Sequence, residues 1–221
     1  MKNLKQLKTA IVYDKVAAAH GGAEQVLQAL NQMFPQAPLF PSVYNPDQAR
    51  WAKVYPAVKT SFLQKLPWAK QKYRCYLPLM PVAFESLDLS DYELVITVTS
   101  GEAKGIITQP DQFHLCYLLT PPRYLYSHQT EYLDSRKILR LPGLRGLAKL
   151  FLKYLRWWDQ AASYRPDLII PISHLIEQRV NKYYSRPSGP VIYPPIDVPF
   201  LKKETQTQDL TQFDLPQDFL L

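Results

Sequence analysis

The sequence predicts an α/β domain in which helices flank a mainly parallel sheet. Short apolar runs rich in β-branched residues alternate with longer segments in which apolar residues recur at helical spacing. Several of the short runs are apolar at consecutive positions, which is typical of strands covered on both faces. The 221 residues are 47% hydrophobic and 20% charged with only 7 Gly, which excludes a disordered or collagen-like chain.

The strand candidates are the short apolar runs, several of them bounded by proline-rich or polar segments. In chain order they are Thr9–Tyr13, Ala57–Phe62, Leu94–Thr99, His114–Leu119, Leu168–Ile172 and Val191–Tyr193. Proline-rich stretches at 35–46, 78–81, 121–122 and 194–199 are expected to separate the elements.

The helix candidates are the segments of helical period, and in chain order they are Ala23–Phe34, Lys70–Tyr76, Leu144–Ala162 and His174–Tyr184. Together with the strands they predict one Rossmann-like domain over residues 1–200. Residues 201–221 are polar and read as a linker with the opening of a second lobe.

Cysteine content and hydropathy predict a cytoplasmic location. Two cysteines, Cys75 and Cys116, are too few for a disulfide scaffold and lack the spacing of a metal site, so we expect no bound metal. The N-terminus lacks the apolar region of a signal peptide. No uncharged apolar run approaches the length of about 18 residues that a membrane-spanning helix needs.

A Gly-Gly loop between the first strand and the first helix is the strongest local motif. The loop residues that we single out are His20, Gly21, Gly22, Ala23 and Glu24. Glycines let the backbone approach a ligand, and the helix N-terminus that follows suits a phosphate or diphosphate. The spacing fits neither the dinucleotide fingerprint nor the P-loop, so we expect no NAD or ATP cofactor. The alternative is that Gly-Gly only forms a turn.

In an open parallel sheet, ligands bind beyond the carboxyl ends of the strands. The residues at those ends are Asp14, Ser100, Gly101, Thr120, Pro121, Arg123, Tyr124, Ser173 and His174. Arg123 is the strongest candidate among them, because a guanidinium can bind a phosphate with two hydrogen bonds. Its alternative is a surface ion pair. No Ser/His/Asp set emerges, and we name no catalytic residue.

The ordered motifs resemble a known family. They read HGGAEQVLQAL, TSFLQKLP, YRCYLPLMPVAFESLDLSDYELVITVTSGEAKG, CYLLTPPRYLY, ISHLIEQRVNKYYSR and VIYPPIDVPF. Over about residues 9–200 the chain resembles the N-terminal domain of glycosyltransferase family 4, whose members are retaining transferases of GT-B fold. The subgroup it resembles comprises mannosyltransferase-type enzymes of bacterial surface polysaccharide assembly.

The resemblance implies one lobe of a two-lobed hexosyltransferase. The substrates would be a nucleotide-sugar donor and a lipid-linked or polysaccharide acceptor, with no resident cofactor and no metal. Gly21 and Gly22 would lie near the donor diphosphate, while Thr120 to Tyr124 and Ser173 would line the cleft between lobes. The lobe that binds the nucleotide, with the family's E-x7-E motif, would follow these 221 residues, so the chain by itself is expected to be inactive.

Two positions depart from the family pattern. Similar sequences carry a histidine where this chain has Leu119, and many carry arginine where it has Gln25. Leucine can donate neither a hydrogen bond nor a proton. Either His20 or a water takes that place, or the chain is a degenerate, non-catalytic binding module that docks on a membrane or a partner.

The positive charge is concentrated in one segment. Residues 136–165 carry eight Lys and Arg residues and one acidic residue, which accounts for the whole formal net charge of +7. Arg145, Lys149, Lys153 and Arg156 form a basic stripe on the helix expected there. Leu144, Leu147, Phe151, Tyr154, Leu155 and Trp158 form its apolar face.

This pattern suits a helix that lies on an anionic membrane at its inner, cytoplasmic face. The alternative is that the apolar face packs on the sheet and the basic face is solvated. Nucleic acid is not an expected partner, since no nucleic-acid-binding motif accompanies the stripe.

Overall fold

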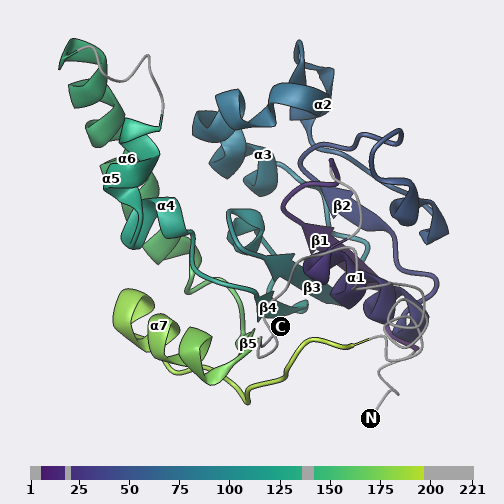
Figure 1. Cartoon of the computed structure of the whole chain (residues 1–221). Coiled ribbons are helices and arrows are strands. Elements are labelled where there is room, and N and C mark those ends of the chain that lie inside the picture. The colour runs from purple at the N-terminus through teal and green to yellow at the C-terminus, as the bar shows by residue number, and fades with distance from the viewer. Residues whose placement is uncertain (1–5, 18–20, 136–141, 197–221) are drawn as a thin grey trace, which may run out of the picture.

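The computed structural model describes residues 6–17, 21–135 and 142–196. Within them a five-stranded sheet has the order β2-β1-β3-β4-β5, and all its strands are parallel (Figure 1). The strands are β1 (Thr9–Tyr13), β2 (Leu39–Pro41), β3 (Leu94–Thr99), β4 (Phe113–Leu118) and β5 (Leu168–Pro171). The predicted α/β class, with a Rossmann-like parallel sheet, is confirmed.

Helices cover both faces of the sheet. They are α1 (Gly22–Met33), α2 (Ala69–Lys72), α3 (Met80–Glu85), α4 (Arg123–Tyr126), α5 (Gln129–Asp134), α6 (Pro142–Ala162) and α7 (His174–Tyr184). Short 3₁₀ helices lie at Arg50–Val54, Phe62–Lys65, Tyr73–Leu79 and Ala103–Gly105.

Successive side chains of β1 point to opposite faces of the sheet, and different helices cover the two faces. Ile11 packs in one apolar cluster with residues of α1, whereas Val12 packs in another with residues of α3. Further along the sheet, Cys116 and Ile169 pack against α7. Because both faces are buried, the strands read as continuous apolar runs.

The register aligns the strand ends that could carry a site. Tyr13 of β1 pairs with Val98 of β3, and Thr99 of β3 pairs with Leu118 of β4. These three strands therefore end at nearly the same level, and the loops that follow them meet at one edge of the sheet.

The expected strand Ala57–Phe62 is wrong. The second strand of the sheet is β2, inside a proline-rich stretch that we expected to be only a separator. Val58 forms one isolated bridge to Leu39, and Lys59 N donates to Leu39 O at 2.9 Å. The segment then turns away, because Ser61 caps the 3₁₀ helix Phe62–Lys65 by accepting from Leu63 N.

The expected strand Val191–Tyr193 is also wrong. Gly189 N and Ile192 N donate to carbonyls of β5, so this segment lies beside the sheet without forming a ladder. Neighbouring prolines at 190, 194 and 195 remove the donors that a ladder needs.

Three of the four expected helices are confirmed. α7 matches its predicted range, α6 begins two residues earlier than predicted and ends as predicted, and α1 lies within one residue of its predicted ends. The fourth, Lys70–Tyr76, is an α-helix only as far as Lys72 and continues as the 3₁₀ helix Tyr73–Leu79, which contains Pro78. The short helices α3, α4 and α5 were not predicted, and the expected linker at 201–221 lies outside the described residues.

Candidate functional site

A cleft of about 610 Å³ opens at the carboxyl edge of the sheet. Its lining comes from the loops after β1, β3 and β4, from the 3₁₀ helix Tyr73–Leu79, and from the α4–α5 region. It lies where a parallel sheet is expected to bind ligands, and its volume lies within the range of small-molecule sites.

Asp14, at the end of β1, holds the loop after β3 in place. Its carboxylate accepts hydrogen bonds from Thr99 Oγ1 at 2.6 Å, Ser100 N at 2.7 Å and Ala103 N at 3.0 Å. A Cβ at Gly101 would lie 3.3 Å from Asp14 Oδ1, which is a tight contact, so glycine lets the loop lie close to this carboxylate. With its oxygens engaged by the protein, Asp14 is a positioning group for the cleft wall.

Glu102 is a buried cleft carboxyl that the sequence did not predict. The Tyr124 hydroxyl donates a hydrogen bond to its Oε1. Burial and the nearby Asp14 charge raise the pKa of Glu102 to about 7, although the Tyr124 hydrogen bond opposes the change. Burial and Glu102 also raise the pKa of Tyr124, which therefore remains a donor. The only sequence signal was an acidic residue three positions after a strand end.

Three cationic side chains, Lys15, Arg74 and Arg123, also line the cleft. Lys15 Nζ lies 5.0 Å and Arg74 Cζ 5.8 Å from the centre of the Tyr73 ring. Among the described residues, none of the three cations forms an ion pair with a carboxylate. The cleft therefore combines available positive charge with a buried carboxyl, a pattern suited to a phosphorylated, hydroxyl-rich ligand.

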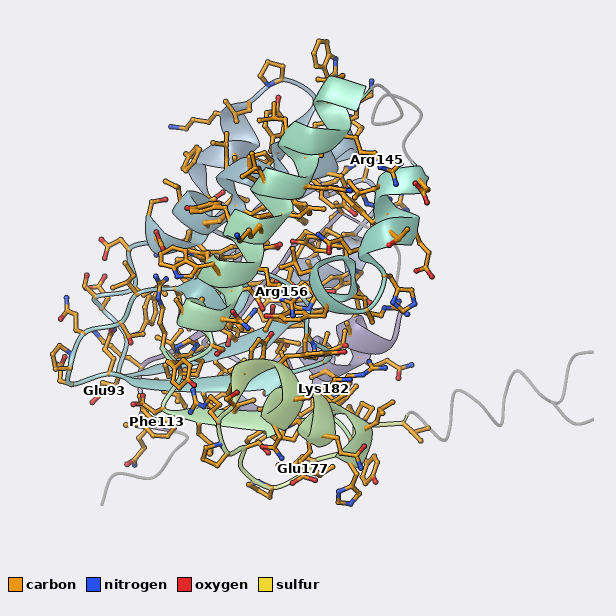
Figure 2. The ribbon with its side chains drawn as sticks, turned by 90° about the vertical axis from the view of Figure 1, so that its left-hand side faces the viewer. Glu93, Phe113, Arg145, Arg156, Glu177 and Lys182 are labelled. Carbon is orange, nitrogen blue, oxygen red and sulfur yellow. The ribbon has the colours of Figure 1, made fainter. Side chains whose placement is uncertain are left out.

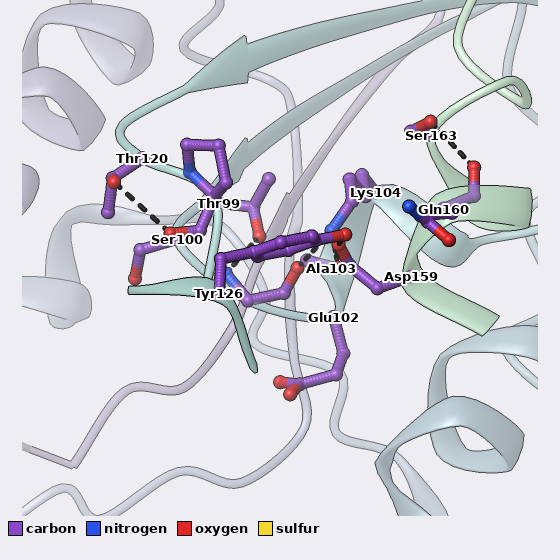
Figure 3. A network of polar contacts seen from close by, with 12 residues as sticks. Thr99, Ser100, Glu102, Ala103, Lys104, Thr120, Tyr126, Asp159, Gln160 and Ser163 are labelled. Atoms are coloured by element: carbon purple, nitrogen blue, oxygen red, sulfur yellow. Dashed lines mark hydrogen bonds and ion pairs between the residues drawn. The ribbon is translucent and has the colours of Figure 1, made fainter. Parts of the chain in front are cut away.

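A buried ion pair between Lys104 and Asp159 supports one side of the cleft (Figure 3). The exposed fractions of the two side chains are 0% and 1%. Lys104 Nζ also donates to Gly101 O at 2.8 Å, and Tyr126 Oη donates to Asp159 Oδ2 at 2.8 Å. The pair thus joins the loop after β3 to α6.

The structure brings six of the expected site residues together in the cleft lining: Asp14, Ser100, Gly101, Thr120, Arg123 and Tyr124. The cleft lining does not include Gly21, Gly22, Ala23, Glu24, Pro121, Ser173 or His174. His20 lies outside the described residues.

At the start of α1, a carboxylate lies beside the Gly-Gly loop. Gly21 is the N-cap and provides no side-chain cap. Glu24 folds back over it, so that a Cβ on Gly21 would lie 2.9 Å from Glu24 Oε2. Tyr13 Oη donates to the same carboxylate at 3.1 Å. Glu24 thus supplies a negative charge to this helix N-terminus.

The two residues expected at the end of β5 have local roles. Ser173 caps α7, its hydroxyl accepting from Ile176 N at 3.4 Å. His174 is exposed, and its Nδ1 lies 3.0 Å from Glu177 Oε2. Neither lines the cleft.

Leu119, where the resemblance implies a histidine, is partly buried against the apolar cluster on the α1 face. The next residue, Thr120, enters the cleft, and its hydroxyl accepts from Arg179 Nη1 at 3.3 Å. A side chain at 119 therefore contributes to packing, and the polar groups of this segment come from Thr120, Arg123 and Tyr124.

Neither a model of a known protein family nor a curated protein matches this sequence. In the described part of the chain, no group of three or more His, Cys, Asp and Glu side chains is placed to hold a metal ion. Within the same residues, no helix has both the length and the apolar composition to cross a bilayer.

Proposed function

We propose that the chain is the acceptor-binding lobe of a retaining glycosyltransferase. The enzyme would move a hexose from a nucleotide-sugar donor to a lipid-linked or polysaccharide acceptor. The observation that supports this most directly is the cleft at the strand ends, where three cations face the same hollow as Glu102 and Tyr124. The ordered motifs that resemble glycosyltransferase family 4 give the proposal its reaction class.

The chemistry of the lining residues fits an acceptor that carries phosphate and sugar. Lys15, Arg74 and Arg123 would bind phosphate oxygens through charge-assisted hydrogen bonds. Glu102 in its ionised form would accept hydrogen bonds from sugar hydroxyls, and Tyr124 would hold its carboxylate in place. Such contacts orient the acceptor hydroxyl toward the anomeric carbon of a donor bound on a second lobe.

Arg123→Ala is expected to weaken acceptor binding about tenfold or more. A hydrogen bond to a charged group contributes about 1.5–3 kcal/mol, which corresponds to that factor. Titration calorimetry with a short-chain alkyl diphosphate-linked hexosamine measures the effect. Arg50→Ala, an exposed arginine on a 3₁₀ helix outside the cleft lining, is the matched control. Equal affinity for the Arg123→Ala and Arg50→Ala chains would contradict the acceptor site.

The 221-residue chain alone is expected to transfer no sugar, because the proposed donor site lies on a second lobe. Incubation with radiolabelled nucleotide-hexoses and the same acceptor, followed by product chromatography, checks this. Fusing the chain to the C-terminal lobe of a family 4 enzyme is expected to yield transfer. Robust transfer by the unfused chain would overturn the proposal that it is half of an enzyme.

The second candidate is a non-catalytic binding module, and Leu119 favours it. This residue packs against the core, and it offers no polar group at the position where the family has a histidine. Acceptor binding without transfer in any such fusion, including one that carries Leu119→His, would favour the module over the enzyme.

A further inference from the structure

Helix α6 has three faces, where the sequence predicted two. The inward face packs against the rest of the domain through Leu152, Leu155 and Trp158, which are almost fully buried, together with Asp159. Two of these, Leu155 and Trp158, belong to the apolar face that the sequence predicted. That expectation was therefore partly wrong, because the buried and exposed apolar residues form separate stripes.

The exposed apolar stripe of α6 consists of Leu147, Leu150, Tyr154 and Trp157. Their side chains are 66%, 68%, 46% and 64% exposed. The spacing of three, four and three residues places them along one side of the helix. Single exposed apolar residues are ordinary, but a continuous stripe with an aromatic pair marks an interaction surface. The rings of Tyr154 and Trp157 lie 6.1 Å apart.

A basic stripe lies next to the apolar one on the outward side of α6, which faces the viewer in Figure 2. Lys149 and Lys153 are exposed and, among the described residues, form no ion pair. Arg156 lies over the Tyr126 ring at 4.9 Å, and Arg145 pairs with Asp134 at 2.8 Å. The two lysines are therefore the charges free to meet a partner.

The charge of the helix indicates which partner fits. Asp159 is the only acidic residue of α6, and it is buried, so the outward side carries positive charge alone. A second copy docked symmetrically would bring these cations near their equivalents, which is unfavourable. An anionic bilayer satisfies both stripes at once, because apolar side chains enter the acyl boundary while lysines lie at the phosphate level.

We propose that α6 docks flat on an anionic phospholipid bilayer. Leu147, Leu150, Tyr154 and Trp157 insert, and Lys149 and Lys153 contact lipid phosphates. This surface is separate from the cleft and does not depend on the proposed function. Where both hold, α6 places the acceptor lobe at a membrane, because α4 and α5, which border the cleft, pack directly on α6.

The test is co-sedimentation of the 221-residue chain with vesicles of phosphatidylcholine containing 30 mol% phosphatidylglycerol. We expect binding to these vesicles and little to phosphatidylcholine alone. Leu150→Ser/Trp157→Ser is expected to lower the partition coefficient at least tenfold. Val54→Ser/Ile107→Ser, which replaces two side chains that are 56% and 57% exposed elsewhere, is the matched control and is expected to bind normally.

The electrostatic part has its own pair of variants. Lys149→Ala/Lys153→Ala is expected to lower the partition coefficient about 30-fold at low salt, since each lysine near an anionic surface contributes a factor of about five. Lys53→Ala/Lys65→Ala, two lysines exposed elsewhere, is the control for net charge. In 0.5 M salt the difference in partition coefficient between these two double variants is expected to shrink.

Three outcomes would overturn the proposal. The first is equal sedimentation of the unaltered chain and Leu150→Ser/Trp157→Ser. The second is a loss of vesicle binding in the matched control variants as large as the loss in the α6 variants. The third is a dimer in light scattering that Leu150→Ser/Trp157→Ser dissociates, which would assign the stripe to a second copy. Circular dichroism of each variant excludes unfolding as the cause. Because acceptor binding is measured without lipid vesicles, failure here leaves the cleft proposal untouched.

Discussion

An Asp159→Asn chain is expected to lose about 3–5 kcal/mol of unfolding free energy. The substitution keeps the shape of the side chain and removes its charge. Lys104, whose side chain is fully buried, then loses the carboxylate with which it forms its ion pair. Removing one member of a buried pair is costly because the other remains charged in a medium that solvates it poorly. The carbonyl of Gly101 accepts a hydrogen bond from Lys104 but does not neutralise it.

Urea denaturation followed by circular dichroism measures this loss. Asp134→Asn is the matched control, because its ion pair with Arg145 is exposed and such pairs contribute between 0 and about 1 kcal/mol. The double variant Lys104→Met/Asp159→Leu removes both charges and is expected to recover most of the stability. Equal effects of Asp159→Asn and Asp134→Asn would contradict the structural role of the buried pair.

The same ion pair indicates why part of the site could not be predicted. Lys104 and Asp159 are 55 positions apart, and no local pattern distinguishes a buried Lys from an exposed one. Asp159 was visible in the sequence only as the single acidic residue of a basic segment. Its partner depends on how α6 crosses the loop after β3, which is a tertiary feature.

Local signals predicted the elements that are long or continuously apolar. β1, β3 and the helices α6 and α7 follow from their apolar runs and periodicity, and the strand ends then located Asp14, Thr120 and Arg123 correctly at one edge. The three residues of β2 were missed because prolines surround them, and its identity as a strand depends on pairing with β1.

Within the cleft, a pH effect on stability is expected at Glu102. Its pKa is raised from 4.5 to about 7 in the folded chain, so between these values the native state binds more protons than the unfolded state. Unfolding free energy therefore falls as the pH rises through this window, by at most about 3 kcal/mol from this one group. Above pH 7 the folded domain holds a buried, charged carboxylate close to Asp14, and below about pH 4.5 both states carry the protonated form.

Glu102→Gln removes this ionisation while keeping an oxygen that can accept from Tyr124. We expect the variant to match the unaltered chain near pH 4.5 and to exceed its stability by up to about 3 kcal/mol at pH 8. Urea denaturation at several pH values measures the difference. Glu131→Gln is the matched control for loss of a carboxylate from the cleft. A constant difference between Glu102→Gln and the unaltered chain across this range would contradict the prediction.

Binding of a ligand with hydroxyl groups would also change the pKa of Glu102. Hydrogen bonds from sugar hydroxyls to the ionised Glu102 would favour its charged form and lower its pKa. Acceptor binding by the unaltered chain should therefore strengthen as the pH rises from 6 to 8, whereas binding by Glu102→Gln should change less. The stability of the empty domain and the affinity of the cleft would then depend on pH in opposite directions. Among the described residues, Tyr124 is the one hydrogen-bond donor that the side chains of the cleft supply to Glu102, so a ligand that adds further donors to this buried carboxylate would gain affinity.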